Sequence, residues 1–220
     1  MRQADTDKDL IARRVAQELR DGDRVNLGIG LPTLVAAYVP KSIRVHFHSE
    51  NGIMGMSPSP GEGFEDPSLT DAGGRPVGAM PGACAFDSAF SFGLIRGGHL
   101  DVTVLGGLEV DEAGRLANWM VPGKMVPGMG GAMDLVTGAR RVIVAMTHRS
   151  ADGPKIVQRC SLPITSIRRV DLIVTELAVI EPTPEGLVLL ETAPGVSVQQ
   201  VIAATSATLH IAPKLRLTDR

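Results

Sequence analysis

The feature that most limits the fold of this chain is a βαβ pattern over residues 24–50. The segment from Arg24 to Gly30 has the pattern of a buried strand that runs into a glycine turn, and Pro32 suits the first position of a following helix. Residues 43–48 alternate β-branched or aromatic with polar side chains, as strands do. We therefore expect an α/β protein with an open, mostly parallel sheet and helices on both faces. At 220 residues, the chain predicts a single domain over residues 1–220.

The end of this unit places a carboxylate at the edge of the predicted sheet. Asn51-Gly52 is a strong turn signal, so the strand over residues 43–48 is expected to stop close to Glu50. Ligands of open α/β sheets bind outside the carboxyl ends of the strands, which makes Glu50 a candidate for chemistry. From this stretch alone, a solvated turn carboxylate is an equally good interpretation.

Periodicity and turn residues predict the remaining elements. Residues 7–20 have apolar side chains on one helical face, behind a capping sequence that starts at Thr6. Further helices are predicted over residues 86–96, 132–138 and 198–204, the last behind Ser197. Strands are predicted over residues 101–107, 141–146, 155–160, 170–175 and 187–191, and a hairpin turn over 110–116. The strands over 141–146 and 155–160 are expected to pair through an Asp152-Gly153 turn. We expect residues 56–82 to form a long shaped loop at the site and the tail from Pro213 to be frayed.

Composition argues against several classes of function. Lys and Arg number 22 against 24 Asp and Glu, so the charge balance does not favour a nucleic-acid-binding protein. No run of about 18 apolar residues occurs and the first ten residues are mostly polar, so neither a membrane span nor a signal peptide is expected. Cys84 and Cys160 have no metal-binding or redox spacing. Together these features predict a cytoplasmic protein.

One of two glycine patterns suggests phosphate binding as an alternative, and the other does not. Gly28 and Gly30 follow a strand, and Glu50 lies 22 positions after Gly28, which partly matches the dinucleotide fingerprint. Thr33 stands in place of the third glycine, so we expect these glycines instead to let two loops pack closely beside Glu50. The Gly123-Lys124 pair lacks the upstream glycine and the hydroxyl residue of a phosphate-binding Walker loop.

A metal site is a further alternative at the same strand. His46, His48 and Glu50 would share one face of an unbroken strand and could bind a divalent metal. This requires the strand to continue through Glu50, which the Asn51-Gly52 turn disfavours. A packed or hydrogen-bonded His48 is the favoured interpretation.

Several motifs then resemble a known family. Ser49-Glu50-Asn51-Gly52-Ile53, followed by Gly55-Met56, resembles the active-site sequence of the B-type chains of 3-oxoacid coenzyme A transferases. The segments Arg96-Gly97-Gly98-His99, Asn118-Trp119-Met120 and Lys124 to Leu135 also resemble that family, and the similarity runs in order from about Val25 to about Val198. Ser57 departs from an expected glycine and Cys84 from an expected serine.

The resemblance implies the coenzyme A transferase fold and a nucleophilic role for Glu50. In that chemistry Glu50 attacks an acyl-coenzyme A, retains coenzyme A as a glutamyl thioester and passes it to a second carboxylic acid, with no metal or redox cofactor. The resemblance places oxyanion or loop support at Asn51, Gly52, Gly128, Gly130 and Gly131, the last three just before a predicted helix. The candidates for contact with substrate or coenzyme A are Gly28, Gly30, Lys124 and Met129.

The resemblance also implies partners and substrates. An A-type chain completes the site in this family, so we expect an obligate hetero-oligomer of two A-type and two B-type chains that acts on acyl-coenzyme A and small carboxylic acids, with no nucleic acid or membrane partner. Residues 124–135 are more similar to the acetoacetate and succinyl-coenzyme A branch than to the 3-oxoadipate branch, which stays an alternative. Arg75 and Lys124 are the candidates to bind a dicarboxylate. An acyl-coenzyme A hydrolase and a non-catalytic binding module remain alternatives.

Overall fold

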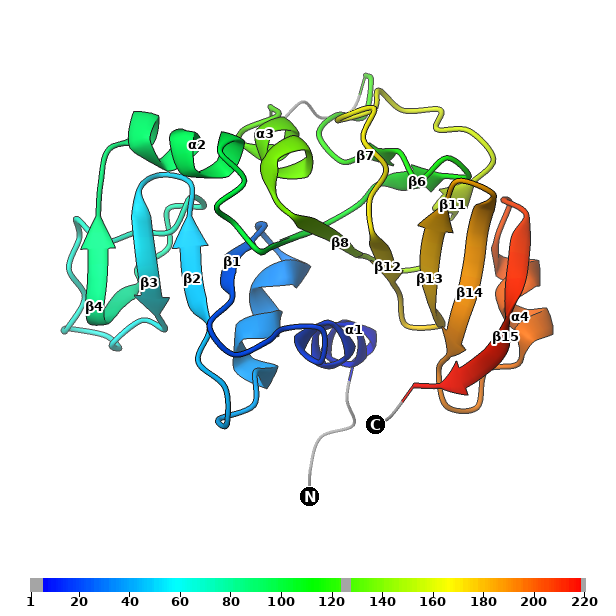
Figure 1. The fold of residues 1–220 in the computed structure, drawn as a ribbon, viewed down its shortest axis with the longest axis horizontal. Helices are drawn as coiled ribbons and strands as arrows, with labels where there is room; N and C mark the ends of the chain where they lie inside the picture. Colours follow the sequence, from blue (N-terminus) through cyan, green and yellow to red (C-terminus); the bar gives the residue numbers. More distant parts are fainter. Residues whose placement is uncertain (1–5, 124–127, 219–220) are drawn as a thin grey trace.

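The computed structural model describes residues 6–123 and 128–218, and a ten-stranded sheet runs through the molecule (Figure 1). The strands lie in the order β15-β14-β13-β12-β8-β5-β1-β2-β3-β4. Their bounds are β1 (Arg24–Leu27), β2 (His46–Ser49), β3 (Ile53–Ser57), β4 (Gly78–Ala85), β5 (Val102–Leu105), β8 (Arg141–Ala145), β12 (Leu172–Val174), β13 (Ala178–Thr183), β14 (Gly186–Thr192) and β15 (Leu209–Leu217). A smaller sheet contains β6 (Glu109–Asp111), β7 (Leu116–Ala117) and β11 (Ile156–Val157), and β9 (Arg149–Ser150) pairs with β10 (Gly153–Pro154).

The middle of the large sheet is parallel, as the βαβ pattern predicts. The strands β2, β1, β5, β8 and β12 pair in parallel, and Asn26 of β1 lies between His48 of β2 and Thr103 of β5. Antiparallel pairs extend the sheet on both sides, and β15 adds to β14 in parallel, so five of the nine pairings are parallel. The predicted α/β class with a mostly parallel sheet is confirmed.

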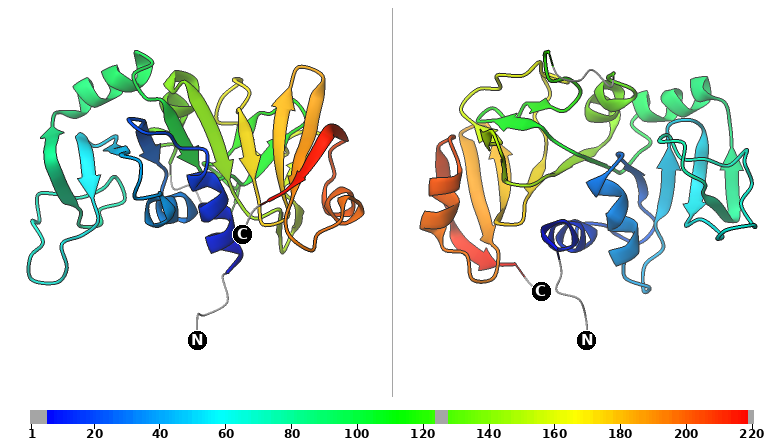
Figure 2. Two further views of the ribbon diagram at one scale, coloured as in Figure 1. Left: turned by 60° about the horizontal axis from the view of Figure 1, so that its bottom comes forward. Right: turned by 180° about the vertical axis from the view of Figure 1, so that it is seen from behind.

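Helices cover both faces of this sheet. The helix α1 (Asp7–Ala16) and the 3₁₀ helix η1 (Leu31–Tyr38) pack on one face, and α2 (Ser88–Arg96), α3 (Ala132–Gly138), α4 (Val198–Ala204) and the small sheet pack on the other. Along β8, Val142 and Val144 belong to one core and Ile143 and Ala145 to the other, because side chains alternate along a strand. Figure 2 shows α1 next to η1, and α4 beside β15 at one end of the sheet. None of the helices in the described part of the chain has the length and apolar composition that crossing a membrane requires.

Three predicted segments are wrong in whole or in part, and in each the true strand partner could not be read from local sequence. The loop predicted over residues 56–82 is confirmed for residues 58–77, but its two ends belong to the antiparallel strands β3 and β4. An edge strand tolerates the proline and glycines of β4. The strand β11 pairs with β6 and not with β8, and the Asp152-Gly153 turn joins only β9 to β10. The tail from Pro213 continues β15, which pairs with β14.

The helix predictions are closer. Thr6 and Asp9 form the capping box that begins α1, but α1 ends at Ala16 and not near residue 20. The helices α3 and α4 coincide with the predicted ranges 132–138 and 198–204, and Ser197 caps α4. The helix expected near Pro32 is a 3₁₀ helix, η1, which begins at Leu31, and not an α-helix.

A buried ion-pair network joins α1 to the last strands. Arg14 donates to both carboxylate oxygens of Glu191, at 2.8 and 2.9 Å, and to Glu18 at 2.7 Å. Glu191 also pairs with Arg216 of β15, and Glu18 pairs with Arg141 at the start of β8. Burial acts to raise the pKa of Glu191, but the hydrogen bonds and charge of Arg14 outweigh it and hold this pKa below its usual value.

Candidate active site at Glu50

Glu50 follows β2 directly and lies at the carboxyl edge of the parallel strands. The β2–β3 turn that carries it lies beside α2, at the upper edge of the molecule in Figure 1. Gly52 in this turn has a φ of 125°, and a Cβ there would collide with the carbonyl oxygen of Phe86. Only glycine fits this backbone conformation and this close approach. The turn that presents Glu50 therefore depends on Gly52.

Asn26 holds the carboxylate of Glu50, and sequence reasoning did not single it out. Asn26 is fully buried in β1, and its Nδ2 donates a hydrogen bond to Glu50 Oε2 at 2.9 Å. The same nitrogen lies 3.3 Å from the backbone oxygen of His48. The available signal was an amide within an apolar strand, because a buried amide requires hydrogen-bond partners. Glu50 is thus oriented by a neutral donor from the neighbouring strand.

His48 lies beneath this pair as a core residue. It is completely buried, its Nε2 lies 2.9 Å from Ser91 Oγ of α2, and its Nδ1 lies 3.4 Å from Asn26 Nδ2. The ring stacks on Phe86 with centroids 6.3 Å apart. Burial lowers the pKa of His48 to about 4, so its ring is neutral at physiological pH.

The geometry does not assemble the alternative metal site. The strand β2 ends at Ser49, and the turn follows at Glu50, so His46, His48 and Glu50 do not lie along one continuous strand. Within residues 6–123 and 128–218, no group of three or more His, Cys, Asp or Glu side chains is placed to hold a metal ion.

Gly131 brings the start of α3 against the Glu50 side chain. Gly131 is buried at the N-cap of α3, and a Cβ on it would stand 3.3 Å from Glu50 Cγ and 3.6 Å from Glu50 Oε1. Gly128 and Gly130, with φ of 90° and 53°, shape the preceding turn, and Met129 accepts a hydrogen bond from the Ala132 N–H. Of this predicted group, the structure brings Gly131 into contact with Glu50.

The other predicted site residues have varied positions. Gly28 donates its N–H to Val104 O, and a Cβ on Gly28 would stand 3.2 Å from that oxygen, so this glycine allows β1 and β5 to approach closely. Gly30, with φ of 88°, begins η1. Asn51 is exposed and donates to Thr70 O at 2.8 Å, away from the carboxylate contacts of Glu50. Lys124 lies outside the described residues.

A largely apolar cleft of about 980 Å³ reaches Glu50. Its walls come from η1, β2, β3 and the connection between β3 and β4. The apolar side chains that line it are Leu27, Ile29, Leu34, Val39, Ile43, Val45, Phe47, Met56, Val77 and Met80. Arg75 also lines the cleft, but its guanidinium pairs with Asp71 at 2.9 Å.

In the described part of the chain, this arrangement sets the carboxylate against two uncharged neighbours, Asn26 and Gly131. Glu50 is half-buried, one oxygen accepts from Asn26, and its methylene carbons face Gly131. A carboxylate so placed can act as a nucleophile or as a general base toward a ligand in the cleft.

Comparison with known proteins gives the following relatives. Residues 8–204 match the coenzyme A transferase family. The beta chain of an acetate CoA-transferase of Escherichia coli is 56% identical over 209 residues, which cover 94% of this chain and 95% of the relative. The B-type chain of a probable succinyl-CoA:3-ketoacid coenzyme A transferase of Bacillus subtilis is 48% identical over 202 residues, covering 91% and 94% of the two chains. The solved structure of an acyl-CoA transferase apoenzyme from Escherichia coli O157:H7 superposes with a TM-score of 0.78 at 25% identity, over 97% of this chain and 43% of that one.

Proposed function

Because this chain belongs to the coenzyme A transferase family, we propose that Glu50 is the nucleophile of its transfer reaction and that the reaction passes through a glutamyl thioester. Glu50 attacks the thioester carbonyl of an acyl-coenzyme A, expelling the coenzyme A thiolate and forming a mixed anhydride. The thiolate then attacks the Glu50 carbonyl carbon, releasing the first carboxylate and leaving coenzyme A on Glu50. A second carboxylate reverses these steps and leaves as the new acyl-coenzyme A.

The observation that carries this proposal is that, among the described residues, the contacts found at the carboxylate come from uncharged groups. Asn26 donates to one oxygen of Glu50, and the backbone of Gly131 lies against the same side chain. A cation in hydrogen-bonding contact would stabilise the charged carboxylate before attack and so raise the barrier to its reaction. An amide orients the carboxylate and raises that barrier less. These steps need no metal or redox cofactor.

The turn before α3 supports the stabilisation of the oxyanion. In the first step negative charge forms on the oxygen of the attacked thioester, and in the second on a carboxyl oxygen of Glu50 itself. Loss of one oxyanion donor typically costs on the order of 10²–10³ in rate. The backbone of Gly131 lies against the Glu50 side chain, and Gly128 and Gly130 add no side chain to the turn before it. We assign the oxyanion donors to this segment.

The apolar cleft supports a site for the pantetheine arm of coenzyme A. That arm is long, with methylene and dimethyl groups between its two amides, and its binding energy can force the acyl end into the reactive position beside Glu50. The cleft has a volume of about 980 Å³, its walls offer apolar contact, and Glu50 is one of the residues that line it.

For the acids, we propose a 3-oxoacid such as acetoacetate as one substrate and acetate or succinate as the other. The relatives named above are chains of an acetate CoA-transferase and of a probable succinyl-CoA:3-ketoacid transferase. Arg75 is already paired with Asp71, which favours the monocarboxylate over the dicarboxylate. We therefore expect acetate to be a better acceptor than succinate. Initial rates with acetoacetyl-coenzyme A and either acid test this preference, and a higher kcat/KM for succinate than for acetate contradicts it.

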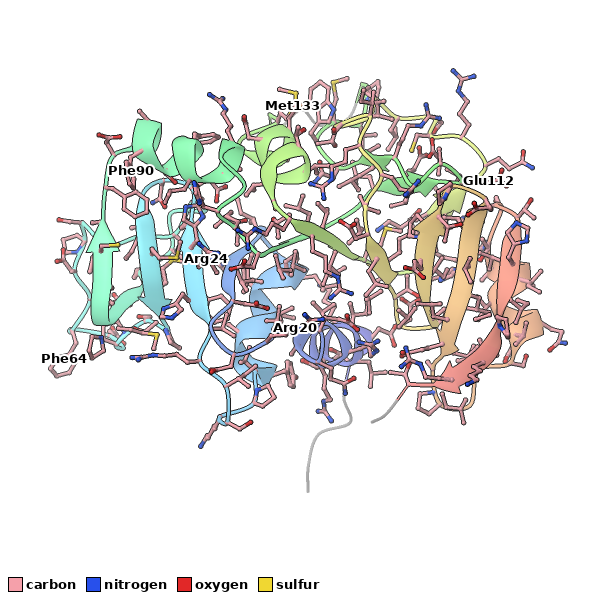
Figure 3. The ribbon with its side chains drawn as sticks, viewed as in Figure 1. Arg20, Arg24, Phe64, Phe90, Glu112 and Met133 are labelled. Carbon is pink, nitrogen blue, oxygen red and sulfur yellow. The ribbon has the colours of Figure 1, made fainter. Side chains whose placement is uncertain are left out.

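We also propose an A-type partner chain. The relatives are named as beta or B-type subunits, and this chain spans 43% of the solved acyl-CoA transferase. Phe90 of α2 and Met133 of α3, labelled in Figure 3, are 57% and 50% exposed on the edge that carries Glu50. A partner over this edge, in a complex of two A-type and two B-type chains, would bury them and cover the nucleophile.

The test of the mechanism is a peptide map of the chain in complex with its partner after incubation with acetoacetyl-coenzyme A. Mass spectrometry should find coenzyme A on the Glu50 peptide, and Glu50→Gln should abolish both the adduct and turnover. Turnover without any adduct, or retained activity of Glu50→Gln, refutes the assignment. Release of free coenzyme A without an acceptor acid would instead indicate a hydrolase.

A further inference from the structure

We propose that His48 and Ser91 are positioning residues that act through Asn26: they keep the amide N–H of Asn26 on the Glu50 carboxylate throughout the reaction cycle. The inference rests on the function proposed for Glu50. It starts from a row of buried polar groups across β2, β1 and β5, in which His48, Asn26 and Thr103 are neighbours in register and all are 0% exposed.

The Asn26 side chain has acceptors on one side and none on the other. Its Nδ2 faces Glu50 Oε2 at 2.9 Å, His48 O at 3.3 Å and His48 Nδ1 at 3.4 Å. Its Oδ1 is buried without a hydrogen-bond partner, and so is Thr103 Oγ1 on the adjacent strand. The observed orientation therefore leaves a buried acceptor unsatisfied, and the three acceptors around Nδ2 must outweigh that cost.

The charge of Glu50 cannot supply this preference at every step. The carboxylate attracts the N–H strongly, but the same side chain is a neutral anhydride and then a neutral thioester in the proposed cycle. An amide that turned over at those stages would present Oδ1 to the reacting carbonyl. The acceptors on His48 do not change during the cycle, so they are the constant part of the preference.

The acceptor character of His48 depends in turn on Ser91. Burial keeps the ring neutral, so one ring nitrogen carries the proton and the other accepts. When Nε2 carries the proton and donates to Ser91 Oγ at 2.9 Å, Nδ1 is free to accept from Asn26. Without the hydroxyl, this form would leave a buried N–H unpaired, which favours the other tautomer. That tautomer places an N–H against Asn26 and favours the reversed amide.

The arrangement also makes the two oxygens of Glu50 different. Oε2 accepts from Asn26, whereas Oε1 lies toward Gly131, 3.6 Å from where a Cβ would stand. An oxygen already bound to a donor is the weaker nucleophile. Attack on the thioester is therefore assigned to Oε1.

A double-mutant cycle in the complex with the partner chain tests this chain of contacts. Ser91→Ala should lower kcat and the rate of formation of the Glu50 thioester about tenfold and change KM for acyl-coenzyme A by less than about twofold, as expected for loss of one positioning hydrogen bond. Ser91→Thr, which keeps the hydroxyl, should restore most of the rate. Ser150→Ala, at an exposed serine of β9 outside α2 and the cleft, serves as the matched control and should leave kcat unchanged.

The background of Asn26→Ala separates positioning from general damage. If Ser91 acts through Asn26, adding Ser91→Ala to Asn26→Ala causes no further loss, because non-additivity identifies residues that act as a unit. A full tenfold loss in that background, or wild-type kcat for Ser91→Ala alone, overturns the inference. A wild-type complex that turns over without a Glu50 thioester overturns the proposed function first, and the inference with it.

Discussion

The substitution Gly131→Ala tests the site most directly, because it adds one methyl group against the proposed nucleophile. The new Cβ would stand 3.3 Å from Glu50 Cγ and 3.3 Å from Phe92 Cζ. Carbon atoms in contact are usually about 3.5–4.0 Å apart, so the methyl group is caught between two side chains and Glu50 must retreat by up to about half an ångström. The backbone itself accepts alanine, since φ is −84° and ψ is 0° at this position.

The expected loss of transfer rate follows from the displacement of Glu50. A misplacement of about 1 Å can cost on the order of 10²-fold in rate, so half of that distance should cost about tenfold, or about 1.4 kcal/mol in the activation barrier. The free energy of unfolding should change by less than about 1 kcal/mol, because no hydrogen bond is lost and no backbone strain is added. The variant is thus predicted to be slow but stable.

The assay measures the rate of coenzyme A transfer to Glu50 by rapid quenching and mass spectrometry. Chemical denaturation of the same variant measures its free energy of unfolding. The matched control is Gly93→Ala in α2, where a Cβ would meet no atom within 4 Å. That change should leave the transfer rate unaltered and stabilise the chain by roughly 0.5–1 kcal/mol, because alanine replaces glycine inside a helix. Wild-type transfer by Gly131→Ala, or a slow variant that is also strongly destabilised, refutes the reasoning.

Three further predictions concern stability and thiol chemistry. Arg14→Met leaves the buried Glu191 carboxylate without its main cationic partner and should lower the free energy of unfolding by about 3 kcal/mol at neutral pH. The pKa of Glu191 is lower in the folded chain than in the unfolded chain, so the extra stability of the wild type is present above the unfolded pKa. In urea titrations, the difference between wild type and variant should fade as the pH falls below about 5. Gly52→Ala, with its Cβ driven into Phe86 O and a φ of 125°, should give little soluble protein or a loss above about 3 kcal/mol. Burial raises the pKa of Cys160 to about 12, so a disulfide reagent at pH 8 should label it far more slowly than the exposed cysteine of β4; equal rates contradict this.

Local sequence predicts elements well where the signal is local. The capping box at Thr6, the capping serine at Ser197 and the turn at Gly52 were all correct, because each depends on residues within a few positions of one another. The strands β4 and β15 were missed for the opposite reason. The apolar side chains of β4 do not alternate, and in β15 Pro213 interrupts the alternation of Leu209, Ile211, Leu215 and Leu217 with mostly polar residues. Each is a strand because a distant neighbour supplies its backbone partners.

The candidate site shows the same division. The turn signal and the resemblance placed Glu50 correctly at the edge of the sheet, and Gly131 next to it is among the predicted glycines. Asn26 was missed because its importance depends on register: β1 must pair with β2 so that residue 26 lies opposite residue 48 and reaches residue 50. A buried amide in an apolar strand is the only trace of this in the sequence.

The exposure of Glu50 bears on the proposed partner chain. In this chain alone Glu50 is half-buried, at the open edge of the sheet, with exposed Phe90 and Met133 on the neighbouring helices. A glutamyl thioester that water could reach would hydrolyse, and the chain would then release coenzyme A instead of transferring it. In the proposed mechanism, coenzyme A in the cleft and the proposed partner over α2 and α3 would close the site and leave access only for the second carboxylic acid. On this proposal, the groups that cover Glu50 decide between transfer and hydrolysis more than the nucleophile itself does.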